Sequence, residues 1–400
     1  MSRQHALPMA EPQALGLCPQ RTQRLLAVLQ AEVDQQRLPG AVAVIARHGK
    51  LALFESVGAL DPALGTAMPR DAVFRIYSMT KPLVSVAAMM LMEQGKLLLS
   101  EPVAKYLPEY AAQQVANLAV DPLQLQAVRQ PATIHDLLRH TAGLTYEFMG
   151  ANAVQRQYAQ ARIGSRQRGN AEFSRQLASL PLLFEPGTVW EYGRATDVLG
   201  RVLEVVSGQT LGAYLDEHIF KPLGMVDSGF WVPKKDHDRI AEPFAQDPQG
   251  GLQMRLIDVR EAALMESGGG GLVSTASDYA CFLQFMLNQG ELDGVRLLGP
   301  RTVAFMTADH LGNIPVNLGA SRELLPLGHG FGLGFAVRKD LGVADVPGSV
   351  GSYFWGGMAG TTFFVDPAAD LFACLMLQAP NQREYYRLLF RNLVYAALMD

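Results

Sequence analysis

The N-terminal part of the chain combines one amphipathic segment with two short apolar runs. Residues 19–38 carry apolar side chains at helical spacing and end at Pro39-Gly40, which predicts an amphipathic helix. Residues 41–47 and 51–57 are apolar and flank His48-Gly49-Lys50, an arrangement typical of a β-hairpin. We therefore expect a helix followed by two antiparallel strands.

The segment from Met79 to Glu93 is apolar at nearly every position. A helix that is apolar on all sides is normally buried on all sides. Pro82 is compatible with a helix only in its first turn, so this helix should begin close to Ser78.

Residues from about 100 to 230 combine loops rich in Gln, Ala and Arg with helical stretches, such as 134–140 and 197–207. No strong alternation of apolar and polar residues occurs there, so we expect a mostly helical lobe. Asp197, at the start of the second stretch, is interpreted as its N-cap, with support of the preceding loop as the alternative. A further helix is predicted at 277–288.

The C-terminal part has the character of a sheet. Strands are predicted at 331–338, 351–358, 361–365 and 371–377. The last two are joined by a turn at residues 366–370. Asn381 is a candidate N-cap for a final helix, in which apolar residues recur on one face.

This order of elements predicts an α+β fold. Its antiparallel β-sheet is flanked by helices and is built from both chain ends, and a mostly helical lobe comes between them. The predicted sheet domain comprises residues 1–77 and 235–400, and the predicted helical domain comprises residues 78–234.

Composition excludes several classes of protein. The 400 residues include 34 Lys and Arg against 38 Asp and Glu, and this balance argues against binding to nucleic acid or to a membrane surface. No apolar run approaches the roughly 18 residues of a membrane helix, and residues 1–18 lack the apolar core of a secretion signal. Cys18, Cys281 and Cys374 have no metal-ligand spacing, so we expect free thiols in a reducing compartment, by default the cytoplasm.

Ser78 and Lys81 form a Ser-x-x-Lys pattern where an extended segment meets the apolar helix. Positions i and i+3 share a helix face, so the amine can reach the hydroxyl. A serine nucleophile needs a base, and burial lowers the pKa of a lysine toward the range in which it accepts a proton. The alternative is an N-capping serine beside a surface lysine.

Tyr192 lies at a junction between a loop and the helix at 197–207. A tyrosine in such a place can point into a cleft, where its phenol becomes a general base if lysine ammonium groups promote loss of its proton. The alternative is a tyrosine packed at the interface of two lobes.

Gly356 and Gly357 lie on a predicted strand, which glycines weaken. They therefore indicate the close approach of a ligand or of another backbone segment. A free N–H on an edge strand is a natural donor to an oxyanion. The alternative is a bulge or a bend in the sheet.

Together these elements resemble the serine β-lactamase and penicillin-binding protein superfamily, whose first motif is Ser-x-x-Lys. The likeness is closest to its esterase branch, the family VIII carboxylesterases, and covers most of the chain. It includes the stretches 74–81, 133–144, 220–225 and 270–275.

The resemblance implies a serine β-lactamase-like fold and a serine carboxylesterase acting on short-chain esters. Ser78 is then the acylated nucleophile, Lys81 its proton partner, and Tyr192 the base that also protonates the leaving group. The backbone N–H groups of Ser78 and Met358 form the oxyanion hole, and the catalytic cleft lies between the two lobes. The implied reaction requires no metal and no organic cofactor.

Two departures from the penicillin-recognising pattern concern substrate binding. Trp355-Gly356-Gly357 stands where β-lactamases have Lys-Thr-Gly, and a tryptophan cannot attract the carboxylate of a β-lactam or a peptide. The esterase branch has the same Trp-x-Gly form, which favours neutral esters. Arg194 occupies the third position of the usual Tyr-x-Asn motif, where it either lines the cleft or faces solvent.

Other functions are compatible with the same residues. The enzyme alternatives are a β-lactamase, a D-alanyl-D-alanine peptidase and an acyltransferase that uses the same acyl-enzyme, and a silent binding or sensor domain is a third class. His135 and His140 are spaced unlike the ligands of a zinc-binding helix, and no G-x-S-x-G motif occurs. We expect a small-molecule ester as the partner.

Overall fold

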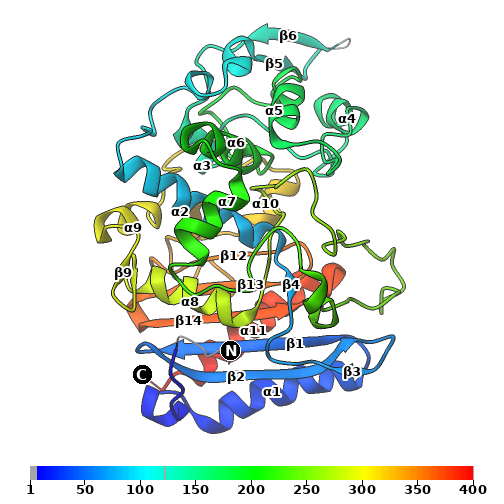
Figure 1. Cartoon of the computed structure of the whole chain (residues 1–400), viewed down its shortest axis with the longest axis vertical. Helices are drawn as coiled ribbons and strands as arrows, with labels where there is room; N and C mark the ends of the chain where they lie inside the picture. Colours follow the sequence, from blue (N-terminus) through cyan, green and yellow to red (C-terminus); the bar gives the residue numbers. More distant parts are fainter. Residues whose placement is uncertain (1–6, 121–122, 400) are drawn as a thin grey trace.

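The computed structural model describes residues 7–120 and 123–399. Its largest element is an eight-stranded antiparallel sheet in the order β10-β11-β12-β13-β14-β1-β2-β3 (Figure 1). The strands are β1 Gly40–Arg47, β2 Lys50–Asp61, β3 Thr66–Ala67, β10 His329–Phe331, β11 Ala336–Arg338, β12 Tyr353–Gly356, β13 Thr362–Asp366 and β14 Leu371–Leu377. β1 pairs with β14, which confirms a sheet built from both ends of the chain.

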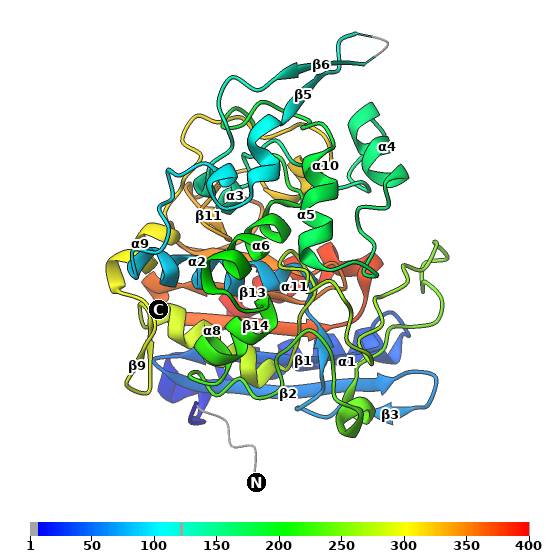
Figure 2. The same ribbon diagram turned by 45° about the horizontal axis from the view of Figure 1, so that its top comes forward.

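Helices cover both faces of this sheet. Every residue of β1 and β14 is buried, and successive side chains of a strand point to opposite faces, so these strands require cover on both sides. α1 (Pro19–Asp34) and α11 (Arg383–Ala397) pack together on one face, and α8 (Ala276–Leu287) packs against β14 and β1 on the other (Figures 1 and 2).

The remaining helices form most of the rest of the molecule. They are α2 Thr80–Glu93, α3 Ile134–Leu138, α4 Ala153–Gln160, α5 Asn170–Ala178, α6 Ala195–Ser207, α7 Leu211–Leu215, α9 Pro300–Met306 and α10 Ala320–Leu324. α3 to α6 gather at the end of the molecule away from β1 and β2 (Figure 1). α2 is buried from Thr80 to Leu91, as its apolar sequence predicts, and it packs against α6.

Three short antiparallel pairs complete the strands of the described residues. They are β4 Phe74–Arg75 with β7 Val273–Ser274, β5 Gln114–Asn117 with β6 Gln124–Ala127, and β8 Glu291–Leu292 with β9 Val295–Arg296. β4 comes directly before the turn that leads into α2, so its pairing with β7 helps to place the start of that helix.

The prediction of one strand at 331–338 is wrong, because β10 and β11 form a hairpin there. Gly334, with φ of +97°, adopts a conformation that L side chains rarely adopt. Gly332 packs so closely that a Cβ would lie 2.3 Å from the Met306 carbonyl oxygen. These two glycines allow the chain to reverse within four residues.

Two further boundaries differ from the sequence predictions. The strand predicted at 351–358 ends at Gly356, because the chain turns at the following residues. Asn381 is not the cap of α11. Gln382 occupies that position, and the Asn381 amide donates instead to Asp247 and to the Leu252 carbonyl.

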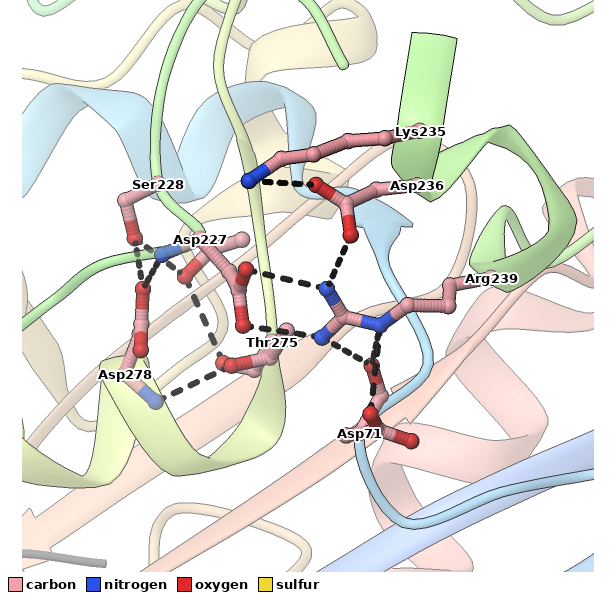
Figure 3. Close-up of polar contacts among 9 residues, drawn as sticks. Asp71, Asp227, Ser228, Lys235, Asp236, Arg239, Thr275 and Asp278 are labelled. Atoms are coloured by element: carbon pink, nitrogen blue, oxygen red, sulfur yellow. Dashed lines mark hydrogen bonds and ion pairs between the residues drawn. The ribbon is translucent and has the colours of Figure 1, made fainter. Parts of the chain in front are cut away.

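The largely buried guanidinium of Arg239 joins the segment that follows the predicted helical lobe to the segment that precedes α2. Arg239 ends a 3-10 helix, Lys234–Arg239, and pairs with Asp227 at 2.8 Å, Asp71 at 3.2 Å and Asp236 at 3.3 Å (Figure 3). Asp71 lies shortly before β4. The cluster therefore holds two segments together that are distant in the sequence.

Replacing this guanidinium should destabilise the protein. We expect Arg239→Gln to lower the free energy of unfolding by about 2–4 kcal/mol, because the largely buried Asp227 and Asp236 both lose their ion pair with this guanidinium. The control is Arg70→Gln, whose half-exposed pair with Glu55 should change stability by less than about 0.5 kcal/mol. Urea denaturation measures both, and equal losses would contradict the role given to Arg239.

Candidate active site

Ser78 and Lys81 meet at the start of α2. Ser78 lies in a 3-10 turn, Tyr77–Met79, that leads directly into the helix, and Lys81 Nζ is 3.2 Å from Ser78 Oγ. Tyr77 has φ of +43°, a left-handed conformation that costs a non-glycine residue about 1–2 kcal/mol. The surrounding structure thus holds a strained turn directly before Ser78.

The Lys81 amine is completely buried. Besides Ser78, its Nζ contacts the Tyr146 hydroxyl at 3.1 Å and the Gly269 carbonyl oxygen at 2.6 Å. Burial lowers the pKa of Lys81 to about 7, and the charge of Arg194 acts in the same direction. The amine therefore exists in part without its extra proton at neutral pH and can accept a proton from a hydroxyl.

Tyr192 approaches the same point from the loop before α6. Its hydroxyl accepts a hydrogen bond of 3.3 Å from Trp355 Nε1, and Lys81 Nζ lies 4.4 Å from the centre of its ring. Burial raises the pKa of Tyr192 above the ordinary range of a phenol, although hydrogen bonding with Ser78 and Trp355 acts in the opposite direction. The hydroxyl is thus protonated at neutral pH. This differs from the deprotonated phenol that the sequence predicts as a general base.

The loop that carries Tyr192 is held by the buried carboxylate of Glu191. This carboxylate accepts hydrogen bonds from Thr145 at 2.6 Å, Asn317 at 2.7 Å and Ser321 at 2.8 Å. The Ser321 hydroxyl also accepts from the Tyr192 N–H at 3.1 Å. A side chain next to Tyr192 in the sequence therefore joins three segments around it.

Asp197 is not the N-cap of α6, so that prediction is wrong. The cap position is occupied by Arg194, and Asp197 is buried in the first turn of the helix. Its carboxylate accepts from the Gly269 N–H at 2.9 Å and from the Ser267 hydroxyl. Asp197 thereby shapes the segment that presents the Gly269 carbonyl to Lys81.

Arg194 is buried and already paired. Its guanidinium forms ion pairs with Glu147 and, at 3.4 Å, with Asp197, and it lies 4.7 Å from the centre of the Tyr146 ring. It borders a cavity next to Ser78, so it lines the site rather than facing solvent.

Met358 lies in the turn after β12. Within the part of the chain that the structure describes, no acceptor pairs with its backbone N–H. A Cβ at the preceding Gly357 would be 2.4 Å from the Ile76 carbonyl oxygen, so this turn packs tightly against the segment before Ser78. Ser78 lies at the start of a helical stretch, where N–H groups lack an acceptor within the helix.

Ser78 borders two cavities, of about 480 and 240 Å³. Ser78, Phe148, Tyr192 and Met358 line both of them. The larger one is also lined by Met149, Met254, Glu323, Leu324, Trp355, Gly356, Gly357, Arg383 and Arg387. The smaller one is more polar in character and is also lined by Tyr77, Tyr146, Glu147, Gly164, Arg166, Arg194, Ile257, Met265, Ser267 and Gly269 to Gly271.

Tyr146 and His140 also belong to the site, although neither residue is predicted from the sequence. Tyr146 contacts Lys81, and the buried His140 ring lies 4.8 Å from that of Tyr192. Burial lowers the pKa of His140 well below its usual value, so the imidazole is neutral. His140 belongs to the stretch 133–144, which carries part of the family resemblance, and Tyr146 follows that stretch. No spacing in the sequence relates either residue to Ser78.

Comparisons with known proteins agree with this architecture. A profile of the Beta-lactamase family matches residues 25–397. Esterase EstB of Burkholderia gladioli is 36% identical over 88% of this chain and 89% of its own length, and lovastatin esterase of Penicillium rubens is 30% identical over 88% and 91%. The solved structure of EstCE1, a hydrolase with promiscuous acyltransferase activity, aligns with a TM-score of 0.78 at 29% identity, over 94% of this chain and 98% of that one.

The chain therefore belongs to the Beta-lactamase family and has the fold of the serine β-lactamases. Its likeness to the esterase branch, the family VIII carboxylesterases, is confirmed, and the protein is a serine hydrolase. In the described part of the chain, none of the helices combines the length and the apolar character needed to cross a membrane.

Asp197 should control the protonation of Lys81. Its negative charge raises the pKa of Lys81, so Asp197→Asn should move the acid limb of Ser78 reactivity to lower pH. The rate at which a fluorophosphonate labels Ser78, measured against pH, reports this limb. Asp370→Asn, in a half-exposed pair with His48, is the control and should leave the limb in place. A lower rate with an unmoved limb would show that Asp197 acts on structure alone.

Proposed function

We propose that this protein is a serine carboxylesterase that hydrolyses carboxylic esters through an acyl-enzyme on Ser78. The observation that supports this proposal best is the convergence of a hydroxyl, a buried amine of lowered pKa and a protonated phenol. Ser78 and Lys81 lie three residues apart at the start of α2, Tyr192 comes from a distant segment, and Ser78 and Tyr192 border both cavities.

In the first half of the reaction, Ser78 Oγ attacks the ester carbonyl and its proton passes to Lys81. A neutral amine has two N–H donors and one lone pair. The donors suit the Gly269 carbonyl and the Tyr146 hydroxyl, which leaves the lone pair for the Ser78 hydroxyl. The N–H groups of Ser78 and Met358 would stabilise the negative charge that develops on the carbonyl oxygen.

Collapse of the tetrahedral intermediate then expels the alcohol. The Tyr192 hydroxyl donates its proton to the leaving oxygen, and the proton held by Lys81 replaces it, so the net transfer runs from Ser78 to the alcohol. Water attacks the acyl-enzyme in the second half, with the same groups moving the protons in reverse. The products are the acid and free Ser78.

The walls of the larger cavity support binding of a small acyl or alcohol group beside Trp355, Gly356 and Gly357. Trp355 contributes apolar area and orients Tyr192 through its indole N–H. Arg194 is occupied by Glu147 and Asp197, so we assign it to shaping the smaller cavity. A cavity of about 480 Å³ suits a short or medium chain better than a long one.

Acyl transfer to a second alcohol is the strongest alternative activity. Ser78 borders two cavities, so one can hold the acyl group while the other admits an acceptor. EstCE1 is described as having such activity beside hydrolysis. β-Lactamase or D-alanyl-D-alanine peptidase activity is disfavoured because Trp355 replaces the strand lysine.

A cytoplasmic location and the division into two domains also stay proposals. The first is supported by Cys18, Cys281 and Cys374, which are thiols. The two predicted domains contact each other, because the Trp190 N–H of the helical domain donates to the Pro315 carbonyl of the sheet domain.

Substitution of the three groups tests the proposal directly. Ser78→Ala should abolish turnover of p-nitrophenyl acetate and butyrate, because no acyl-enzyme can form. Tyr192→Phe should lower kcat about 10²–10⁴-fold, because the leaving group loses its proton donor. His48→Ala, at an exposed turn, should retain activity.

The same assay separates the alternatives. A chromogenic cephalosporin that is turned over faster than the esters would favour a β-lactamase. A one-to-one covalent adduct without turnover would favour a sensor, and esters formed from an added alcohol would favour an acyltransferase.

The pH profile should follow Lys81. Because the folded-state pKa of Lys81 is about 7, the amine is protonated below that pH and cannot accept the Ser78 proton. We expect kcat/KM to fall about tenfold per pH unit below pH 7 and to level off above it. A rate of p-nitrophenyl butyrate hydrolysis that stays constant from pH 5 to 9 would exclude Lys81 as the proton acceptor.

A further inference from the structure

Two arginines of the C-terminal helix line the larger cavity. Arg383 and Arg387 are the first and fifth residues of α11, and the i,i+4 spacing places them on one face. Among the described residues that line this cavity, Glu323 is the only carboxylate, and the other walls are mainly apolar. The cavity next to Ser78 therefore carries an excess of positive charge.

Arg387 is only partly neutralised. Its Nη1 donates to Glu384 at 3.1 Å, but the Glu384 side chain is 49% exposed and that of Arg387 is 16% exposed. Solvent screens such a pair strongly. Arg387 Nε is buried without a hydrogen-bond partner among the described residues. The guanidinium thus has donor capacity that the protein does not use.

The position of Arg387 is also costly for the protein. Moving a guanidinium out of water is unfavourable unless the charge is well paired. Burial lowers the pKa of Arg387, and the charge of Arg383 acts in the same direction. A group kept at such a cost is compensated when an anion occupies the cavity.

The guanidinium lies close to the reacting groups. A Cβ at Gly356 would be 2.6 Å from Arg387 Nη2, so the guanidinium packs directly on β12. The neighbouring residue, Trp355, contacts the Tyr192 hydroxyl. Ser78, Tyr192 and Arg387 line the same cavity of about 480 Å³, so an anion on Arg387 would lie a few bonds from the ester carbonyl.

We propose that Arg387 binds a carboxylate on the substrate, and that the enzyme prefers esters that carry a carboxylate a few bonds from the reacting carbonyl. This inference rests on the proposed esterase function. Arg387 supplies from a helix the positive charge that Trp355 does not supply from the strand. The carboxylate belongs either to the acyl part or to the alcohol part of the ester, and both cases use the same guanidinium.

Matched substrates test this preference. Monomethyl adipate and its neutral amide, methyl adipamate, probe the acyl part, and 4-acetoxybutanoate and 4-acetoxybutanamide probe the alcohol part. Titration of the released acid gives kcat/KM for each ester. We expect the unmodified enzyme to prefer the carboxylate in at least one pair, and that pair identifies where the carboxylate lies.

The variants locate the preference. Arg387→Gln should lower the ratio of kcat/KM for the carboxylate over the amide by about 10- to 100-fold, the loss expected for a charge-assisted hydrogen bond. Arg387→Lys should retain part of the preference, because it keeps the charge but not the forked geometry. Arg296→Gln, at a half-exposed pair with Glu291, is the control and should leave the ratio unchanged.

One further measurement does not depend on turnover, and another does not depend on the folding of a variant. The Ser78→Ala protein should bind monomethyl adipate more tightly than methyl adipamate in titration calorimetry, even if the hydrolysis mechanism proposed above is wrong. In the unmodified enzyme, adipate should inhibit p-nitrophenyl butyrate hydrolysis more strongly than adipamide. Equal binding and equal inhibition, or an unchanged ratio in a folded Arg387→Gln variant, would overturn the proposal.

Discussion

The chemistry of this site depends on the burial of one amine. Among the described residues, no carboxylate contacts the Lys81 amine, and its Nζ contacts the hydroxyls of Ser78 and Tyr146 and the carbonyl oxygen of Gly269. These neutral partners satisfy an amine but compensate an ammonium charge poorly, and the low-dielectric surroundings therefore lower the pKa of Lys81. A carboxylate in contact with Nζ would hold the proton and remove the base.

Two buried carboxylates, Asp197 and Glu191, form hydrogen bonds with the segments around the site and not with the Lys81 amine. Asp197 is held by Gly269, Ser267 and Arg194, and Glu191 by Thr145, Asn317 and Ser321. A buried carboxylate that lost such partners would cost roughly 1–3 kcal/mol per missing hydrogen bond. These hydrogen bonds hold irregular loops in place. They explain how Tyr192 and the Gly269 carbonyl are positioned without regular secondary structure.

The sheet contributes to the site through its two chain ends. β1 from the N-terminal part pairs with β14 and with β2, and β12 and α11 from the C-terminal part supply one wall of the larger cavity. The glycines of β12 and of the following turn allow close packing on both sides. Gly357 adjoins the Ile76 carbonyl, and Gly356 adjoins the Arg387 guanidinium. The strand thus connects the turn that carries Ser78 with α11, which carries Arg387.

Local patterns in the sequence were enough to predict the hairpin, the buried α2 and the i,i+3 approach of Lys81 to Ser78, because each depends on neighbours within a few residues. Strand positions were predicted where apolar runs were continuous, as in β14, but the reversal at Gly332 and Gly334 depends on packing against Met306. Likewise, the contact of Lys81 with Tyr146, the bond of Asp197 to Gly269 and the approach of Arg387 to Gly356 join residues 65, 72 and 31 positions apart. Only the tertiary structure decided these, because spacing along a chain carries no information about which distant side chains share a buried site.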